Sequence, residues 1–109
     1  LEMREIARQV PIAEPVAEYL MDVVMKTHPQ QEEAPEQVRQ YVRYGASPRG
    51  AQAMLQAARI FALLAGRYHV AYEDVKQAAK PALRHRVFLN FEGMAEGMTP
   101  DEIIEALLT

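Results

Sequence analysis

The sequence predicts an all-α fold, a small bundle of four to six helices around one central helix, Ser47–Ala65. The central segment begins with residues that favour a helix start, ends at Gly66, and is apolar over most of its length. Segments on both sides of it have apolar residues at helical spacing, and extended backbone is expected only over short stretches. We therefore expect essentially no sheet.

The first part of the chain predicts two helices joined by extended backbone. Leu1–Gln9 has helix-like apolar spacing and predicts the tail of a helix that ends before Pro11. Val10–Ile12 is expected to be extended, because the residue before a proline is disfavoured in the α region. A second helix is predicted from Pro15 to about His28, with an apolar face of Val16, Tyr19, Leu20, Val23 and Val24.

The segment from His28 to Tyr44 divides into a loop and an ambiguous element. His28–Pro35 is polar and bracketed by prolines, which predicts a mobile loop. Glu36–Tyr44 fits a short helix through Val38, Tyr41 and Val42, while its last four residues fit extended backbone equally well. Gly45-Ala46 is the predicted turn into the central helix.

The central helix is predicted from both of its ends. Ser47 is an N-cap candidate and Pro48 suits the first helical position, where its missing N–H leaves no hydrogen bond unmade. Gly66 suits a left-handed C-cap. Between them the polar side chains form one narrow stripe, so we expect other elements to surround the helix on its remaining sides; the stripe is Arg49, Gln52, Gln56 and Arg59.

Arg49 lies in the first turn of this helix, where the helix dipole opposes a cation by about 0.3–1 kcal/mol. An exposed arginine tolerated at this small cost would explain its position. Alternatively, the start of the helix faces an anion that belongs to something outside the chain. Helical spacing by itself favours the first interpretation.

The last third predicts two further helices. Arg67–Ala71 is a short crossing, and a helix from about Tyr72 should be kinked or split by Pro81. Val87–Phe91 is expected to be extended over the core, with Gly93 and Gly97 bracketing a turn. Thr99-Pro100-Asp101-Glu102 has the form of a capping box, followed by a helix to about Leu108 with Ile103, Ile104, Leu107 and Leu108 directed inward.

Length and composition indicate one domain without disulfide bonds. The 109 residues can bury a single core, and the absence of cysteine excludes disulfides and thiolate metal sites. The lack of cysteine suits the cytoplasmic location that we expect. No apolar run approaches the length of a membrane span, and no signal peptide is recognised. The chain has no initiating Met and begins inside an expected helix, so we interpret it as a fragment of a longer polypeptide.

Charge is distributed unevenly along the chain, whose net charge is −3. Residues 1–38 carry eight acids and three bases, residues 39–86 carry nine bases and two acids, and residues 87–109 carry five acids and no base. The basic middle could mark a surface for an anionic ligand. The favoured interpretation is that the blocks neutralise one another across the fold.

Motifs that would carry chemistry within the chain are few. No GxxxxGK[ST] loop is present, and the histidines at 28, 69 and 85 lack metal-ligand spacing. Arg84-His85-Arg86 ends a predicted helix, where cations complement the dipole. That structural interpretation is favoured over a phosphate or partner contact, although both can hold.

An ordered series of motifs resembles the lid domain of the MoxR family of AAA+ ATPases. The series begins with Tyr41-Val42-Arg43-Tyr44 and the central Gly45-Ala46-Ser47-Pro48-Arg49 before an Ala-rich helix. It continues in family order over nearly the whole chain, through Gly66-Arg67-Tyr68, Glu73-Asp74-Val75, Pro81-Ala82-Leu83-Arg84-His85-Arg86 and Leu89-Asn90-Phe91-Glu92. One departure is Ala71, where a serine or threonine cap is more usual, which concerns helix stability only.

The resemblance implies a helical lid that follows an ATP-binding core N-terminal to residue 1. Arg49 would be its "sensor 2" arginine, which approaches the γ-phosphate of ATP, and Ser47 would belong to the same cofactor-binding motif. ATP or ADP with Mg²⁺ would be bound mainly by the core. The resemblance further implies a ring, expected to be a hexamer, chaperone-like action on client proteins, and a von Willebrand A-type partner protein. With the family in view, the functional interpretation of Arg49 is the favoured one.

Two alternatives remain beside this interpretation. A helical module that binds nucleic acid or protein without a nucleotide role would use the basic middle segment, but would need its Lys and Arg gathered on one exposed face. A helical scaffold without any ligand is the other. The sequence does not identify the client protein. It also does not determine whether Arg49 contacts the nucleotide of its own subunit or of a neighbouring one.

Overall fold

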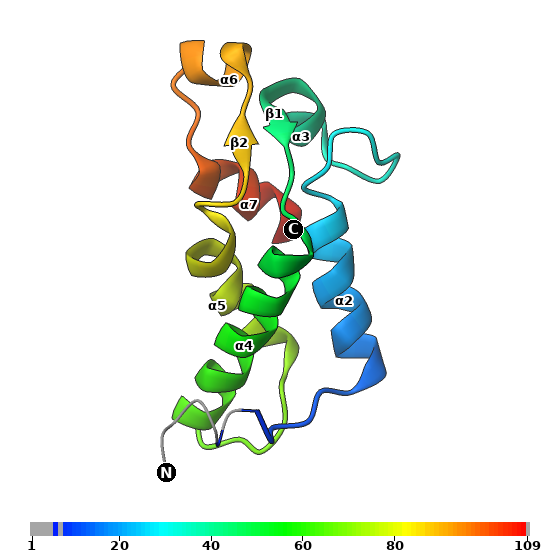
Figure 1. Ribbon diagram of the computed structural model, residues 1–109, viewed down its shortest axis with the longest axis vertical. Coiled ribbons are helices and arrows are strands. Elements are labelled where there is room, and N and C mark those ends of the chain that lie inside the picture. Colours follow the sequence, from blue (N-terminus) through cyan, green and yellow to red (C-terminus); the bar gives the residue numbers. More distant parts are fainter. Residues whose placement is uncertain (1–5, 7, 109) are drawn as a thin grey trace.

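The computed structural model describes residues 6 and 8–108, which form six α-helices and one small two-stranded sheet (Figure 1). The helices are α2 (Glu14–Met25), α3 (Glu36–Tyr41), α4 (Pro48–Leu64), α5 (Tyr72–Leu83), α6 (Phe91–Ala95) and α7 (Pro100–Leu108), and the strands are β1 (Val42–Tyr44) and β2 (Phe88–Leu89). The predicted helical bundle is confirmed. The helix expected over Leu1–Gln9 lies almost entirely outside the described residues.

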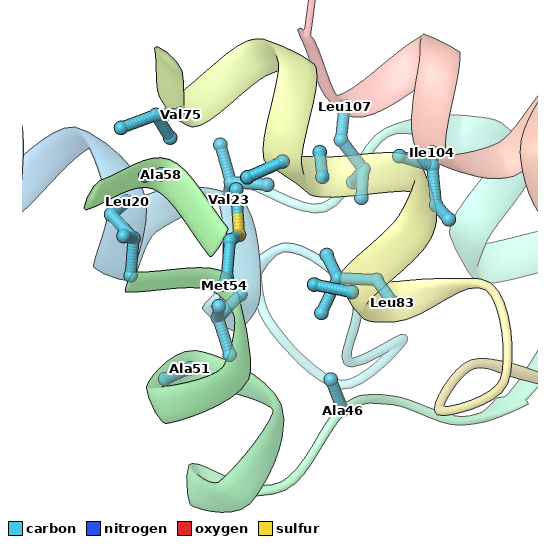
Figure 2. Packing of buried hydrophobic residues seen from close by; sticks show 14 of the residues in the cluster. Leu20, Val23, Ala46, Ala51, Met54, Ala58, Val75, Leu83, Ile104 and Leu107 are labelled. Carbon is cyan, nitrogen blue, oxygen red and sulfur yellow. The ribbon is translucent and has the colours of Figure 1, made fainter. Parts of the chain in front are cut away.

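Helix α4 is the centre of the bundle, with α5 packed along one side and α2 along another (Figure 1). Met54, Ala58 and Ala62 of α4 are completely buried, and their spacing of four residues places them on one face. Two alanines on this face let the neighbouring helices approach closely. Figure 2 shows side chains from α2, α4, α5 and α7 converging on this core, including Leu20, Met54, Leu83 and Ile104.

The expectation that other elements enclose α4 on every side except its polar stripe is wrong. Leu55 and Phe61 are only half-buried, and Leu64 remains 65% exposed. A shallow apolar cavity of about 190 Å³ also lies between α2 and the first half of α4, lined partly by Met21 and Leu55. The bundle is too small to cover the whole circumference of its central helix.

The ambiguous segment before the central helix adopts both predicted conformations in succession. Glu36–Tyr41 is helical, and Val42–Tyr44 is a strand that pairs antiparallel with Phe88–Leu89. The pairing joins Val42 to Leu89 and Tyr44 to Phe88, with an irregularity between them. The expectation of essentially no sheet therefore missed a short one, which sits with α3 and α6 at one end of the molecule (Figure 1).

Helix α5 runs through Pro81 without being split, so of the two outcomes expected at this proline, a kink or a split, the split is wrong. The helix ends at Leu83, so the missing N–H of Pro81 removes one hydrogen bond in the last turn. Helical bonding resumes at once, because Arg84 N donates to Lys80 O at 3.0 Å. Ala82 and Leu83 are buried in the core, and this burial holds the last turn in helical form.

The segment after β2 also differs from its prediction. Phe91 is the first residue of α6 rather than part of an extended strand, and it is 84% exposed. Gly93 lies inside α6, whereas Gly97 occupies a turn with a positive φ of 74°. Asn90 starts α6 by accepting a hydrogen bond from Gly93 N at 2.8 Å, a local cap that the sequence interpretation did not use.

The remaining elements lie close to their predicted positions. Helix α2 begins at Glu14 and ends at Met25, slightly shorter than expected, and the helix α7 follows Thr99, whose hydroxyl accepts from Glu102 N at 3.2 Å. Ile103, Ile104 and Leu107 are buried, while Leu108 is half-buried. Val10 and Pro11 are not helical, as expected, and Ile12 forms an isolated parallel bridge with Val70.

Candidate functional site

Helix α4 starts where the sequence places it, but Ser47 does not cap it through its side chain. Ser47 has the extended backbone of an N-cap, with φ −81° and ψ 175°, yet its hydroxyl makes no cap hydrogen bond. The first helical bonds run to its carbonyl instead, from Gly50 N at 2.8 Å and Ala51 N at 3.3 Å. The exposed hydroxyl of Ser47 is therefore available to a group outside the described part of the chain.

Arg49 is exposed in the first turn of α4 and has no partner among the described residues. Of the seven arginines between positions 39 and 86, all of which the structure describes, Arg49 alone makes no hydrogen bond, ion pair or ring contact. A cation at this end of a helix is disfavoured by the dipole. Within residues 6 and 8–108, no carboxylate pairs with Arg49 to offset its charge.

The turn before Arg49 is attached to the C-terminal end of α2. Ala46 N donates to Thr27 Oγ1 at 2.9 Å, and His28 Nε2 donates to Ala46 O at 2.8 Å. Gly45 passes so close to Thr27 that a Cβ atom on it would lie 2.6 Å from the Thr27 carbonyl oxygen. The sequence interpretation assigned Thr27 and His28 no role, because nothing local connects them to a turn 18 and 19 residues later.

The cluster Arg84-His85-Arg86 is divided by the structure. Arg84 pairs with Asp101 of α7 through two contacts of 3.0 Å, which is a link between helices. Arg86 donates to Ala82 O at 3.5 Å, at the C-terminal end of α5, and its Cδ would be 3.2 Å from a Cβ on Gly50. The contact of Arg86 agrees with the predicted placement of a cation at a helix C-terminus, whereas Arg84 links two helices, which the sequence interpretation did not predict.

Ion pairs join the basic middle of the chain to acids. Lys80 contacts Glu105 at 2.6 Å and Arg84 contacts Asp101, so two of these bases are neutralised by the acidic last segment. Arg67 pairs with the buried carboxylate of Asp74. This distribution supports mutual neutralisation of the charge blocks and leaves fewer free cations for a nucleic-acid surface.

The described residues contain no group of three or more His, Asp or Glu side chains arranged to hold a metal ion. Within residues 6 and 8–108, no helix has both the length and the apolar character needed to cross a bilayer. The start of α4 thus differs from the rest of the described surface in two ways. Arg49 has no partner among the described residues, and the nearby hydroxyl of Ser47 makes no cap hydrogen bond.

Comparison with known proteins identifies the family. The AAA lid domain family matches residues 34–107. The chain is 32% identical over 108 residues to the chaperone MoxR1 of Mycobacterium tuberculosis. The aligned segment covers 99% of this chain and 29% of MoxR1. The protein MoxR of Paracoccus denitrificans is 40% identical over 70 residues, covering 62% of this chain and 21% of its own length.

A solved structure supports the same assignment. A crystal structure of a candidate ATPase from Cytophaga hutchinsonii superposes with a TM-score of 0.88 at 35% identity, over 95% of this chain and 32% of that one. The chain thus spans about a third or less of the length of these relatives. The chain belongs to the AAA lid domain family, and among AAA+ proteins it is a lid domain of the MoxR type.

Proposed function

We propose that this domain is the C-terminal lid of a MoxR-like AAA+ ATPase and that Arg49 is its sensor 2 residue. Arg49 contacts the γ-phosphate of ATP that is held, with Mg²⁺, mainly by a nucleotide-binding core elsewhere in the same polypeptide. The observation that carries the proposal is that Arg49, alone among the seven arginines from 39 to 86, has no polar or ring partner in the described part of the chain.

The chemistry of the side chain suits this role. A guanidinium presents paired N–H donors that match phosphate oxygens and can offset the charge that develops during phosphoryl transfer. The exposed hydroxyl of Ser47 and the positive end of the 17-residue helix α4 add favourable interactions with an anion. The chain lacks a phosphate-binding loop and, in its described part, a cluster of metal ligands, so it contributes a contact to the nucleotide rather than a complete site.

The proposed consequence is that the lid moves relative to the core when the bound nucleotide changes. A contact with the γ-phosphate exists with ATP and is lost with ADP, so the angle between lid and core reports the nucleotide state. Arg49 lies in the first turn of α4, the helix around which the other helices pack. A displacement of Arg49 would therefore move the whole lid. The ring, which we expect to be a hexamer, would pass this movement to client proteins in a chaperone-like role, as the name of MoxR1 suggests.

Further parts of the proposal rest on family resemblance. These are a von Willebrand A-type partner protein and a cytoplasmic location. They define the setting in which the lid moves and are independent of the assignment of Arg49.

The decisive experiment is Arg49→Ala in the full-length ATPase. We expect ATP turnover to fall at least tenfold, which is about 1.4 kcal/mol on the barrier. The melting temperature of the 109-residue domain should be nearly unchanged, because Arg49 is exposed and makes no hydrogen bond or ion pair with the residues that the structure describes. Unchanged turnover would remove the sensor assignment and leave a lid domain without a direct nucleotide contact.

A further inference from the structure

Two residues in the turn directly after α2 hold both polar groups of Ala46. The Ala46 N–H donates to Thr27 Oγ1 at 2.9 Å, and its carbonyl accepts from His28 Nε2 at 2.8 Å. Thr27 is fully buried, one of two buried polar or charged residues in the described part of the chain. We call this pair of contacts the α2 clamp.

The hydroxyl of Thr27 has a defined orientation. It donates to Val24 O in the last turn of α2 at 2.5 Å, which leaves its lone pairs directed toward Ala46 N. A buried hydroxyl with both roles occupied cannot rotate without leaving a polar group unpaired, at a cost of about 1–3 kcal/mol. The clamp therefore connects the backbone of α2 rigidly to the turn.

Ala46 in turn contacts the start of α4. Its side chain points into the core (Figure 2), is 1% exposed, and its Cβ would be 3.0 Å from a Cβ on Gly50. Gly45 has no room to move toward α2, because Thr27 already lies against it. Gly45 before Ala46 and Gly50 after it are thus confined, and Arg49 lies between Ala46 and Gly50 in the sequence.

We propose that Thr27 and His28 are positioning residues for Arg49. The α2 clamp holds the turn so that the guanidinium of Arg49 meets the phosphate in one geometry, and α2 therefore moves together with the sensor. This inference rests on the proposed sensor role of Arg49. It assigns a function to two residues that lie 22 and 21 positions before Arg49 in the sequence and are not proposed to touch the nucleotide themselves.

The test is a double-mutant cycle in the full-length ATPase. Thr27→Val keeps the shape of the side chain and removes the hydroxyl, and it should lower turnover by roughly threefold to tenfold, since small misplacements of a contacting group have effects of this order. In an Arg49→Ala background, the same substitution should have no further effect. Thr27→Ser, which retains the hydroxyl, should keep turnover near that of the unmodified protein.

Controls separate positioning from loss of stability. Val75→Ala creates a cavity at a fully buried position of α5 and serves as a stability match, with turnover unchanged wherever the protein is folded. If Thr27→Val folds poorly, His28→Ala provides the same cycle, because His28 is only half-buried and loses one hydrogen bond.

Each outcome supports or contradicts the positioning role of Thr27 and His28. Equal loss from Thr27→Val with and without Arg49, or no loss at all, overturns the inference while the sensor role stands. Full turnover in Arg49→Ala alone overturns the sensor role and the inference together. Loss confined to the background that contains Arg49 supports both.

Discussion

Asp74 is completely buried in the first turn of α5 and binds the guanidinium of Arg67 across the turn that joins α4 to α5. The second oxygen of the carboxylate accepts from Ala71 N at 2.8 Å. Ala71 has no side-chain oxygen with which to cap the helix, so this bond from Asp74 secures the start of α5. The departure at Ala71 from the usual cap is thus compensated three residues later.

Replacing Asp74 should cost much more than replacing Asp101, although both carboxylates pair with an arginine. Asp74→Asn removes charge-assisted hydrogen bonds at a fully buried site, and we expect a loss of about 2 kcal/mol in the free energy of unfolding. Asp101→Asn breaks an exposed pair, with side chains 43% and 45% exposed, and should cost less than about 1 kcal/mol. Urea denaturation of the 109-residue chain measures both, and equal losses would contradict the role of burial.

Arg49→Lys should fall between the unmodified protein and Arg49→Ala in ATP turnover. Lysine keeps the positive charge but lacks the planar fork of donors that binds two phosphate oxygens at once. Steady-state turnover of the full-length ATPase at saturating ATP is the measurement. Turnover as high as that of the arginine form would indicate that charge alone suffices at this position.

Gly45→Ala and Gly66→Ala should destabilise the domain for different reasons. At Gly45 a Cβ would lie 2.6 Å from the backbone oxygen of Thr27, which cannot move without disturbing α2, so we expect a loss above about 2 kcal/mol. At Gly66 nothing lies within 4 Å, but φ is +77°, and the strain of a left-handed alanine is about 1 kcal/mol. Thermal and urea denaturation distinguish the two.

The same pair of variants also separates stability from function. Gly45→Ala displaces the turn before Arg49 and should lower ATP turnover in the full-length protein, whereas Gly66→Ala, at the opposite end of α4, should not. A comparable loss of turnover in both would show that turnover follows stability alone.

Tyr19→Phe should stabilise the domain. The hydroxyl of Tyr19 is buried without a hydrogen-bond partner in the described structure, and its ring packs edge-on against Tyr72 with centroids 5.4 Å apart. Phenylalanine keeps the ring contact and removes the unpaired hydroxyl, so we expect a gain of about 1 kcal/mol in the free energy of unfolding. A loss would mean that the hydroxyl is satisfied.

Tyr19 also predicts a dependence of stability on alkaline pH. Burial raises the pKa of Tyr19 above its ordinary value of 10.0, because it disfavours the charged phenolate. The folded state then holds the proton more tightly than the unfolded state, so this stability is present below pH 10 and is lost as the pH rises through the raised pKa. The decline of stability above pH 10 should be shallower in Tyr19→Phe than in the unmodified protein.

Local signals in the sequence determined the helical class and several helix boundaries. Pro48 and Gly66 frame α4, and Thr99-Pro100 starts α7, because capping and proline geometry act within a few residues. The unusual position of Arg49 was equally visible, since the direction of a helix dipole follows from the helix itself. Its role was suggested by the order of motifs along the chain and remains a prediction.

Tertiary structure alone decided the features that join distant segments. The pairing of Val42–Tyr44 with Phe88–Leu89, the α2 clamp on Ala46 and the lack of a partner for Arg49 among the described residues all depend on which surfaces the bundle brings together. Periodicity and propensity describe neighbours within a few residues, so they cannot predict contacts across 18 or more positions. Pro81 is a further example of a local signal that tertiary structure overrides. Burial of Ala82 and Leu83 keeps the last turn of α5 helical although a proline favours a break there.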